Sequence, residues 1–224
     1  MSHIEDEIRE LKKDVLKMMV LVHKQLSKGQ DAIYQFDKDL ANEIMVKENK
    51  VNAYELRIDE DCENIIALFN PVANDLRFVL AVFKINADLE RMGDYAEGIA
   101  RYILHFEREL DPAILKKLRF QEMYQLILSM IDDVVCGFKD EAPKEARKVF
   151  HKDKTINEIN ATAADTIIPI MKEHPDQTGQ LLYLLSIIRK LERVGDLTKN
   201  IAEDTIFYVE AKVLKHKKEK ERKK

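Results

Sequence analysis

Two copies of a Glu-x-x-x-Asp pair give this chain residues that could bind metal cations. The hexapeptide Leu-Glu-Arg-x-Gly-Asp occurs at residues 89–94 and again at residues 191–196, a displacement of 102 positions. Further matches flank it in the same register, which indicates an internal duplication. On a helix, residues four apart share one face, so each pair of carboxylates projects together. Oxygen ligands of this kind suit hard and borderline cations.

Each pair belongs to a longer row of oxygen-bearing side chains on two helices, and most members of the row follow a core position by one residue. One residue is about 100° of helix rotation, so these side chains flank the core. We call the first row the first acidic ridge; it comprises Glu48, Asn52, Glu55, Asp59, Glu90, Asp94 and Glu97. The second acidic ridge comprises Asp153, Asn157, Asn160, Glu192 and Asp196. If the two helices of a ridge face each other, bound cations are the expected counter-charge.

The second acidic ridge is poorer in carboxylates. Lys199 occupies the position that corresponds to Glu97, and Ala164 the position that corresponds to Asp59. We therefore expect the second ridge to bind metal less tightly than the first, or to bind fewer ions.

Other interpretations of these residues need no ligand. A single Glu-x-x-x-Asp in a chain with 41 acidic residues is most often a solvated helix face, and only its duplication argues otherwise. Gly93 and Gly195, retained in both copies, suggest the close approach of another helix. Arg91 and Arg193 are potential ion-pair partners of the nearby carboxylates. No catalytic constellation is found: nucleotide-binding loops, zinc motifs and activated nucleophiles are absent from the sequence.

The apolar residues recur at spacings of three and four along six segments, which predicts long amphipathic helices. Only 6 Gly and 5 Pro interrupt the 224 residues, and the turn signals of a β protein are missing. The sequence predicts an all-α fold of two tandem, pseudo-symmetric, antiparallel three-helix bundles, each in the order short, long, long. Lys28–Asp31 is predicted to end the first helix, with Gly29 as a left-handed C-terminal residue. Asn70-Pro71 is predicted to end the second, and Asp111-Pro112 to begin the fourth.

We expect the first bundle over residues 1–109, the second over 110–211, and a basic, disordered tail over 212–224. The tail has a net charge of +6, whereas the whole chain has −4. A solvated helix end is the simplest interpretation of it; adhesion to an anionic membrane surface or an acidic partner is the alternative. Nucleic acid is not an expected partner. Without an apolar run of membrane-spanning length, and with Cys62 and Cys136 expected as buried thiols, the sequence predicts a cytoplasmic protein.

Two stretches carry a resemblance to a known family. Residues 70–77 read Asn-Pro-Val-Ala-Asn-Asp-Leu-Arg, and residues 84–94 read Lys-Ile-Asn-Ala-Asp-Leu-Glu-Arg-Met-Gly-Asp. With the second copy of the motif and the tandem layout, the chain resembles the PhoU family of bacterial phosphate-uptake regulators over about residues 5 to 210. The resemblance implies iron, zinc or magnesium-like ions at Glu90 and Asp94 and at Glu192 and Asp196. The other members of the two ridges are implied as partners of these pairs.

The resemblance also implies a function without catalysis. Such proteins repress the phosphate-starvation response by coupling the ATPase subunit of the phosphate ABC transporter to a sensor histidine kinase. A homodimer, which reaches the membrane only through these partners, is the expected form. The alternative is a helical metal-binding scaffold or metal-buffering protein with no kinase partner.

Overall fold

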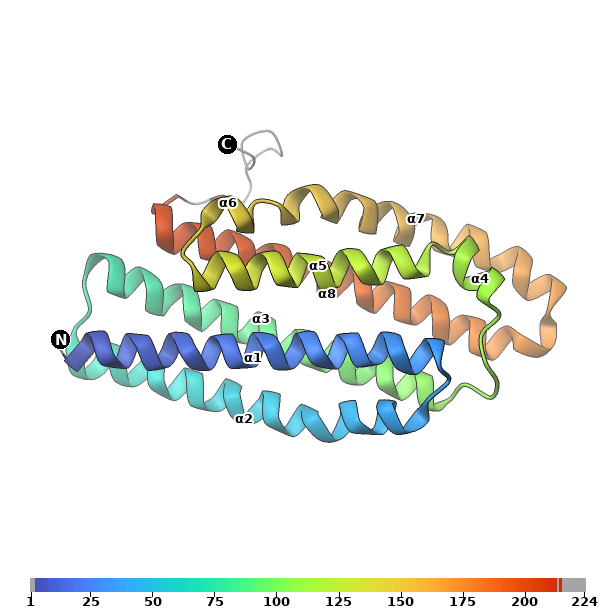
Figure 1. Cartoon of the computed structure of the whole chain (residues 1–224), viewed down its shortest axis with the longest axis horizontal. Helices are drawn as coiled ribbons and strands as arrows, with labels where there is room; N and C mark the ends of the chain where they lie inside the picture. The colour runs from blue at the N-terminus through green and yellow to red at the C-terminus, as the bar shows by residue number, and fades with distance from the viewer. Residues whose placement is uncertain (1–2, 213, 215–224) are drawn as a thin grey trace.

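The computed structural model describes residues 3–212 and 214, which form helices and no β-strand. The first half contains three helices of 32 residues each, α1 (His3–Tyr34), α2 (Lys38–Phe69) and α3 (Ala73–Leu104). The second half contains α4 (Pro112–Lys117), α5 (Phe120–Lys139), α6 (Pro143–Ala146), α7 (Val149–Glu173), the 3-10 turn η1 (Pro175–Gln177) and α8 (Thr178–Glu210). The predicted all-helical fold with six long helices is confirmed (Figure 1).

The six long helices form two bundles that lie against each other along their length. Helices α1, α2 and α3 make up one bundle, and α5, α7 and α8 make up the other (Figure 1). The two bundles meet chiefly through α3 and α8, with α1 against α5 as a second line of contact. Each copy of the Leu-Glu-Arg-x-Gly-Asp motif therefore lies on a helix at the centre of the molecule.

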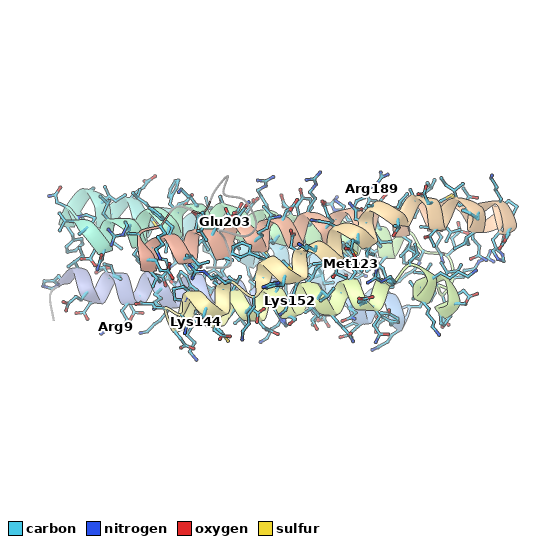
Figure 2. The ribbon with its side chains drawn as sticks, turned by 90° about the horizontal axis from the view of Figure 1, so that it is seen from above. Arg9, Met123, Lys144, Lys152, Arg189 and Glu203 are labelled. Carbon is cyan, nitrogen blue, oxygen red and sulfur yellow. The ribbon has the colours of Figure 1, made fainter. Side chains whose placement is uncertain are left out.

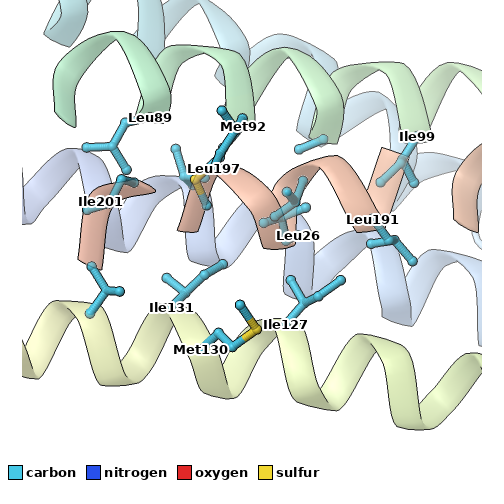
Figure 3. Close-up of a cluster of buried hydrophobic side chains, with 14 of the residues drawn as sticks. Leu26, Leu89, Met92, Ile99, Ile127, Met130, Ile131, Leu191, Leu197 and Ile201 are labelled. Carbon is cyan, nitrogen blue, oxygen red and sulfur yellow. The ribbon is translucent and has the colours of Figure 1, made fainter. Parts of the chain in front are cut away.

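The apolar seams of both halves merge into one continuous core. Figure 3 shows side chains from both bundles in this core, among them Leu89 and Met92 of α3, Ile127 of α5, and Leu191 of α8. All four are at most 1% exposed. Full burial of such a side chain contributes about 1.5–3 kcal/mol, so the core fixes the two motif helices against each other.

Two predicted helix boundaries are confirmed. Helix α2 ends at Phe69, and Asn70 adopts the left-handed conformation at φ 47° before Pro71. The Asp111 carboxylate accepts a hydrogen bond from the Ala113 N–H at 2.7 Å, and Pro112 is the first residue of α4.

The predicted end of the first helix is wrong. Helix α1 continues through Gly29 to Tyr34, so the order short, long, long does not hold in the first half. Gly29 is buried, and a Cβ on it would lie 3.0 Å from the hydroxyl of Tyr124 on α5. The glycine therefore allows α5 to approach α1 and does not end the helix.

The second half is more broken than predicted. The expected fourth helix is divided into α4 and α5 at Arg119, which has a positive φ of 51°. The expected fifth helix, for which the sequence predicts a start at Pro143, does begin there but is divided into α6 and α7 at Arg147 and Lys148, and α7 then continues through Pro169. Neither break contains a glycine, which is why the sequence pattern did not reveal it.

The remaining predictions about the chain have mixed outcomes. Cys62 is buried, and burial raises its pKa to about 12, whereas Cys136 is exposed and not the buried thiol that was predicted. The predicted tail, apart from Lys212 and Leu214, lies outside the described residues. Over the part of the chain that is described, no helix is both long and apolar enough to cross a membrane.

Candidate metal-binding ridges

Glu48 is the most deeply placed carboxylate of the first acidic ridge. It lies on α2, is 5% exposed, and packs against Gly93 of α3. The side-chain amide of Gln25, on α1, donates a hydrogen bond to Glu48 Oε2 at 3.0 Å. Glu48 Oε1 is buried without a hydrogen-bond partner among the described residues. One buried anionic oxygen is therefore uncompensated, which is costly unless a further donor or cation reaches it.

The carboxylates of α2 and α3 influence one another's protonation. The pKa of Glu48 is raised to about 7, first by burial and then by the negative charges of Asp94, Glu97 and Glu90. The pKa of Glu90 is raised by burial and by the charges of Asp94 and Glu55. Five of the seven predicted members of this ridge thus face one another closely enough to interact. A cation among them would relieve both the burial and the repulsion.

The other members of the first acidic ridge have different surroundings. Asp59 Oδ1 accepts a hydrogen bond at 2.8 Å from the amide of Asn86, a fully buried residue of α3. Glu97 is paired with Arg101 at 2.8 Å, one turn further along the same helix. Asn52 is exposed. Asp59 and Glu97 therefore already have partners within the protein, whereas Glu48 lacks one for its second oxygen.

The second acidic ridge contains a cation that belongs to the protein. The Lys199 ammonium lies 2.8 Å from Asp196 Oδ1 and 3.1 Å from Asp153 Oδ2, so it connects α8 with α7. The Asn157 amide donates a weak hydrogen bond of 3.3 Å to the same oxygen of Asp153. Asn160 and Glu192 line one surface pocket together. Of the predicted residues of this ridge, Asp153 and Asp196 are thus brought together around a lysine, whereas Asn160 and Glu192 meet at a separate pocket.

The two motif arginines differ in their ion pairs. Arg193 lies 3.5 Å from Glu192 and 3.6 Å from Asp196. Arg91 forms no comparable ion pair within the described part of the chain. The interpretation of these arginines as ion-pair partners therefore holds for the second copy alone.

The donor chemistry of the first acidic ridge fits a hard cation, although its side chains are not arranged around one. Among the described residues, no three His, Cys, Asp or Glu side chains form a cluster that could hold a metal ion as they stand. The unpartnered oxygen of Glu48 and the nearby carboxylates of Glu90, Asp94 and Glu97 nevertheless supply anionic oxygens only. These are the ligands that magnesium, calcium and manganese prefer.

Sequence reasoning missed the two amides that hold the ridge carboxylates in place. Gln25 reaches Glu48 from α1, and Asn86 donates both to Asp59 and to the main-chain oxygen of Glu55, each at 2.8 Å. Both are polar residues next to a core position, Leu26 and Ile85. That adjacency was the available signal, but periodicity alone does not show which helix a flanking side chain meets.

The two motif glycines are not equivalent. A Cβ on Gly93 would lie 2.9 Å from Val51 Cγ1 and 3.0 Å from the carboxylate of Glu48. A Cβ on Gly195 would make only ordinary contacts with Ile156, at 3.5 and 3.6 Å. A second helix thus packs against both glycines, but only at Gly93 is it so close that a Cβ would clash.

We expect opposite effects when each motif glycine is replaced by alanine. Gly93→Ala should lower the free energy of unfolding by about 1–2 kcal/mol, because the stiff Val51 side chain must shift. Gly195→Ala should raise it by about 0.5–1 kcal/mol, because the gain in helix propensity meets no clash. Urea unfolding of both variants in the presence of chelator measures the difference. Shifts of the same sign in the two variants would contradict the structural distinction.

The fold and the ridges define a class of protein, in which two three-helix bundles each carry a Leu-Glu-Arg-x-Gly-Asp helix beside an acidic row. The PhoU domain family matches the chain twice, at residues 15–103 and 120–205. The chain belongs to the PhoU family, a family of accessory and regulatory proteins rather than enzymes.

Individual relatives cover nearly the whole chain. The phosphate-specific transport system accessory protein PhoU homolog of Aquifex aeolicus is 31% identical over 96% of this chain and 97% of its own length. The Escherichia coli phosphate-specific transport system accessory protein PhoU is 30% identical over 94% of this chain and 86% of its own. The crystal structure of PhoU from Pseudomonas aeruginosa has a TM-score of 0.88 at 29% identity, covering 94% of this chain and 100% of that one. That of the phosphate transport system regulatory protein PhoU from Streptococcus pneumoniae has a TM-score of 0.84 at 30% identity, with 95% and 99% covered.

Proposed function

We propose that this protein is a cytoplasmic negative regulator of phosphate uptake and of phosphate-starvation signalling. Its partners are the ATPase subunit of a phosphate ABC transporter and a phosphate-sensing histidine kinase, and it acts as a homodimer that reaches the membrane only through them. The observation that carries this proposal is the near full-length match to accessory proteins of phosphate-specific transport, together with two matches to the PhoU domain.

A metal ion on the first acidic ridge is part of the proposed function. Glu48, Glu55, Asp59, Glu90, Asp94 and Glu97, with the amide oxygen of Asn52, would supply the ligands. A divalent or trivalent ion, such as iron, zinc or a magnesium-like ion, would compensate the negative charge of the buried Glu48 carboxylate, whose cost the raised pKa reflects. The apolar seams lie on other faces of the same helices, so the ion would organise the surface for partner binding while the helices fold without it.

We expect deletion of the gene to leave phosphate-starvation promoters active in phosphate-rich medium. Loss of a repressing link between transporter and kinase removes the signal that phosphate is sufficient. A reporter fused to a phosphate-responsive promoter, measured in deletion and complemented strains, provides the measurement. Normal repression in a clean deletion would contradict the proposal.

The alternative function, a helical metal-binding scaffold or metal-buffering protein, predicts different partners. Affinity capture of the full chain from phosphate-replete cells should recover the transporter ATPase and the sensor kinase if the regulatory function is correct. Recovery of neither, together with normal phosphate signalling and altered cellular metal content in the deletion strain, would favour the alternative.

A further inference from the structure

Lys199 occupies a special position in the duplicated motif. It stands three residues after Asp196, where the first copy has Glu97 three residues after Asp94. The charge at this position is therefore reversed between the two halves. The Lys199 side chain reaches across from α8 to α7 and contacts one carboxylate on each helix, at 2.8 Å on Asp196 and 3.1 Å on Asp153.

The contacts of Lys199 are partly shielded from water. The side chain of Lys199 is 20% exposed and that of Asp153 is 13% exposed. The Lys199 ammonium donates one hydrogen bond to a carboxylate of each helix, so both of its contacts are charge-assisted hydrogen bonds.

Within the described part of the chain, two other cations near Asp153 have different partners. Lys152, the residue before Asp153 (labelled in Figure 2), donates hydrogen bonds to α5 instead, to Asp133 at 2.5 Å and to Ser129 Oγ at 2.6 Å. Arg193 approaches Asp196 and Glu192 only at 3.5–3.6 Å, and its side chain is 63% exposed. Asp153 thus obtains its counter-charge from Lys199.

The corresponding place in the first half has no such cation. Within the described residues, no Lys or Arg forms an ion pair with Glu48, Glu90 or Asp94, and Glu97 pairs along its own helix with Arg101. Glu48 retains an unpartnered buried oxygen. In the second half, Asp153 Oδ1 also lacks a hydrogen bond, but this single oxygen falls far short of the six or more that a divalent hard cation takes.

We propose that the Lys199 ammonium is the built-in cation of the second acidic ridge and takes the place of a metal ion there. Asp153 and Asp196 are committed to the lysine, and a divalent ion would have to break both charge-assisted hydrogen bonds to use them. The two ridges then differ in their source of positive charge. The first acidic ridge binds a metal ion, whereas in the second the Lys199 ion pairs hold α7 and α8 together whether or not metal is available. The inference rests on the proposed function in one respect, that carboxylate ridges of this protein bind divalent ions.

The test uses the full chain carrying Glu90→Ala and Asp94→Ala, which remove metal binding at the first acidic ridge, and Mn²⁺ as the probe. We call this double variant the parent, and we expect calorimetry to detect no Mn²⁺ binding at its second ridge. Addition of Lys199→Glu should create one Mn²⁺ site per chain, at least about tenfold tighter than any residual binding in the parent, because a repelling charge is replaced by a ligand. Mn²⁺ should then also raise the melting temperature of this variant.

Three further variants make the result specific. Lys199→Arg keeps the cation and should bind no Mn²⁺, whereas Lys199→Met removes the charge and should gain a weaker site. Lys24→Glu changes the net charge by the same amount on the exposed face of α1 and should gain none. If Lys199→Glu does not fold without metal, Lys199→Met carries the comparison.

Two outcomes would overturn the proposal. One is Mn²⁺ binding by the parent that disappears when Glu192 and Asp196 are also replaced by alanine. The other is no gain of Mn²⁺ in either Lys199→Glu or Lys199→Met, while the wild-type protein binds Mn²⁺ at its first ridge. Failure of the proposed metal role is distinguishable from both, because the wild-type protein would then bind no Mn²⁺ at all.

Discussion

Replacement of both Glu90 and Asp94 with alanine is expected to remove most of the bound divalent metal from the purified protein. The same change at Glu192 and Asp196 should remove little. The first acidic ridge offers six carboxylates and the second offers three, of which Asp153 and Asp196 are bound to Lys199. Because divalent-ion affinity rises with the number of anionic oxygens that can converge, we expect the two ridges to differ in affinity by roughly tenfold or more.

Elemental analysis of the two double variants, after equilibration with the same metal solution, measures this difference. Far-UV circular dichroism serves as the control, because chelation should leave the helical signal of the wild-type protein unchanged. The apolar seams that hold the bundles are separate from the ridges, and seam residues such as Val51 and Ile85 are fully buried in the apolar core. Equal metal losses from the two pairs, or none from either, would contradict the assignment. Collapse of the helical signal on chelation would show instead that the ions are structural.

The apolar periodicity predicted the fold well because it reports directly on burial. Val82, Ile85 and Leu89 follow one another at spacings of three and four, and all are at most 1% exposed in the structure. Glycine was less informative. Gly29 was interpreted as a helix end, but it permits the close approach of Tyr124, and either role suits a residue without a Cβ.

The candidate site could be predicted as far as helix spacing determines which faces carry carboxylates. The motif spacing identified Glu90 and Asp94 as neighbours on one face. The one-residue offset for Glu55, and a place one turn earlier for Glu48, indicated two further carboxylates on the neighbouring helix. The charge of Glu55 does act on Glu90, and the charges of Glu90 and Asp94 act on Glu48. The individual hydrogen bonds between helices were not predictable from spacing. The hydrogen bond from Gln25 to Glu48 depends on how α1 is rotated against α2, which a single sequence does not specify.

Lys199 illustrates the same limit at the second ridge. The sequence showed a lysine where the first copy has a glutamate, and this predicted weaker metal binding. The bridge from α8 to Asp153 on α7 became visible only when the two helices were placed side by side. The lysine at position 199, which in the sequence indicated only a weaker metal site, therefore also forms an ion pair that joins two helices.

Glu48→Gln is expected to stabilise the metal-free protein above pH 7. The pKa of Glu48 is raised from 4.5 in the unfolded chain to about 7 in the folded protein, first by burial and then by neighbouring carboxylates. Below pH 4.5 the carboxyl is protonated in both states and costs nothing. As the pH rises from 4.5 to 7, the carboxyl ionises in the unfolded chain before it does in the folded protein, so the free energy of unfolding falls. Above pH 7 the full cost of the buried anion is present. Since one pKa unit corresponds to about 1.4 kcal/mol, removal of this charge should raise the free energy of unfolding by on the order of 3 kcal/mol.

Urea unfolding with chelator at pH 8 and at pH 4 measures this effect, with Glu60→Gln on the exposed face of α2 as the matched control. The advantage of Glu48→Gln should be near its maximum at pH 8 and absent at pH 4, while Glu60→Gln stays within about 0.5 kcal/mol of wild type. Saturating divalent metal should reverse the order at pH 8, because the ion stabilises the folded wild type through the ionised Glu48 and the amide is a poorer ligand. An advantage of equal size at both pH values would mean that packing, and not the buried charge, sets the stability at this position.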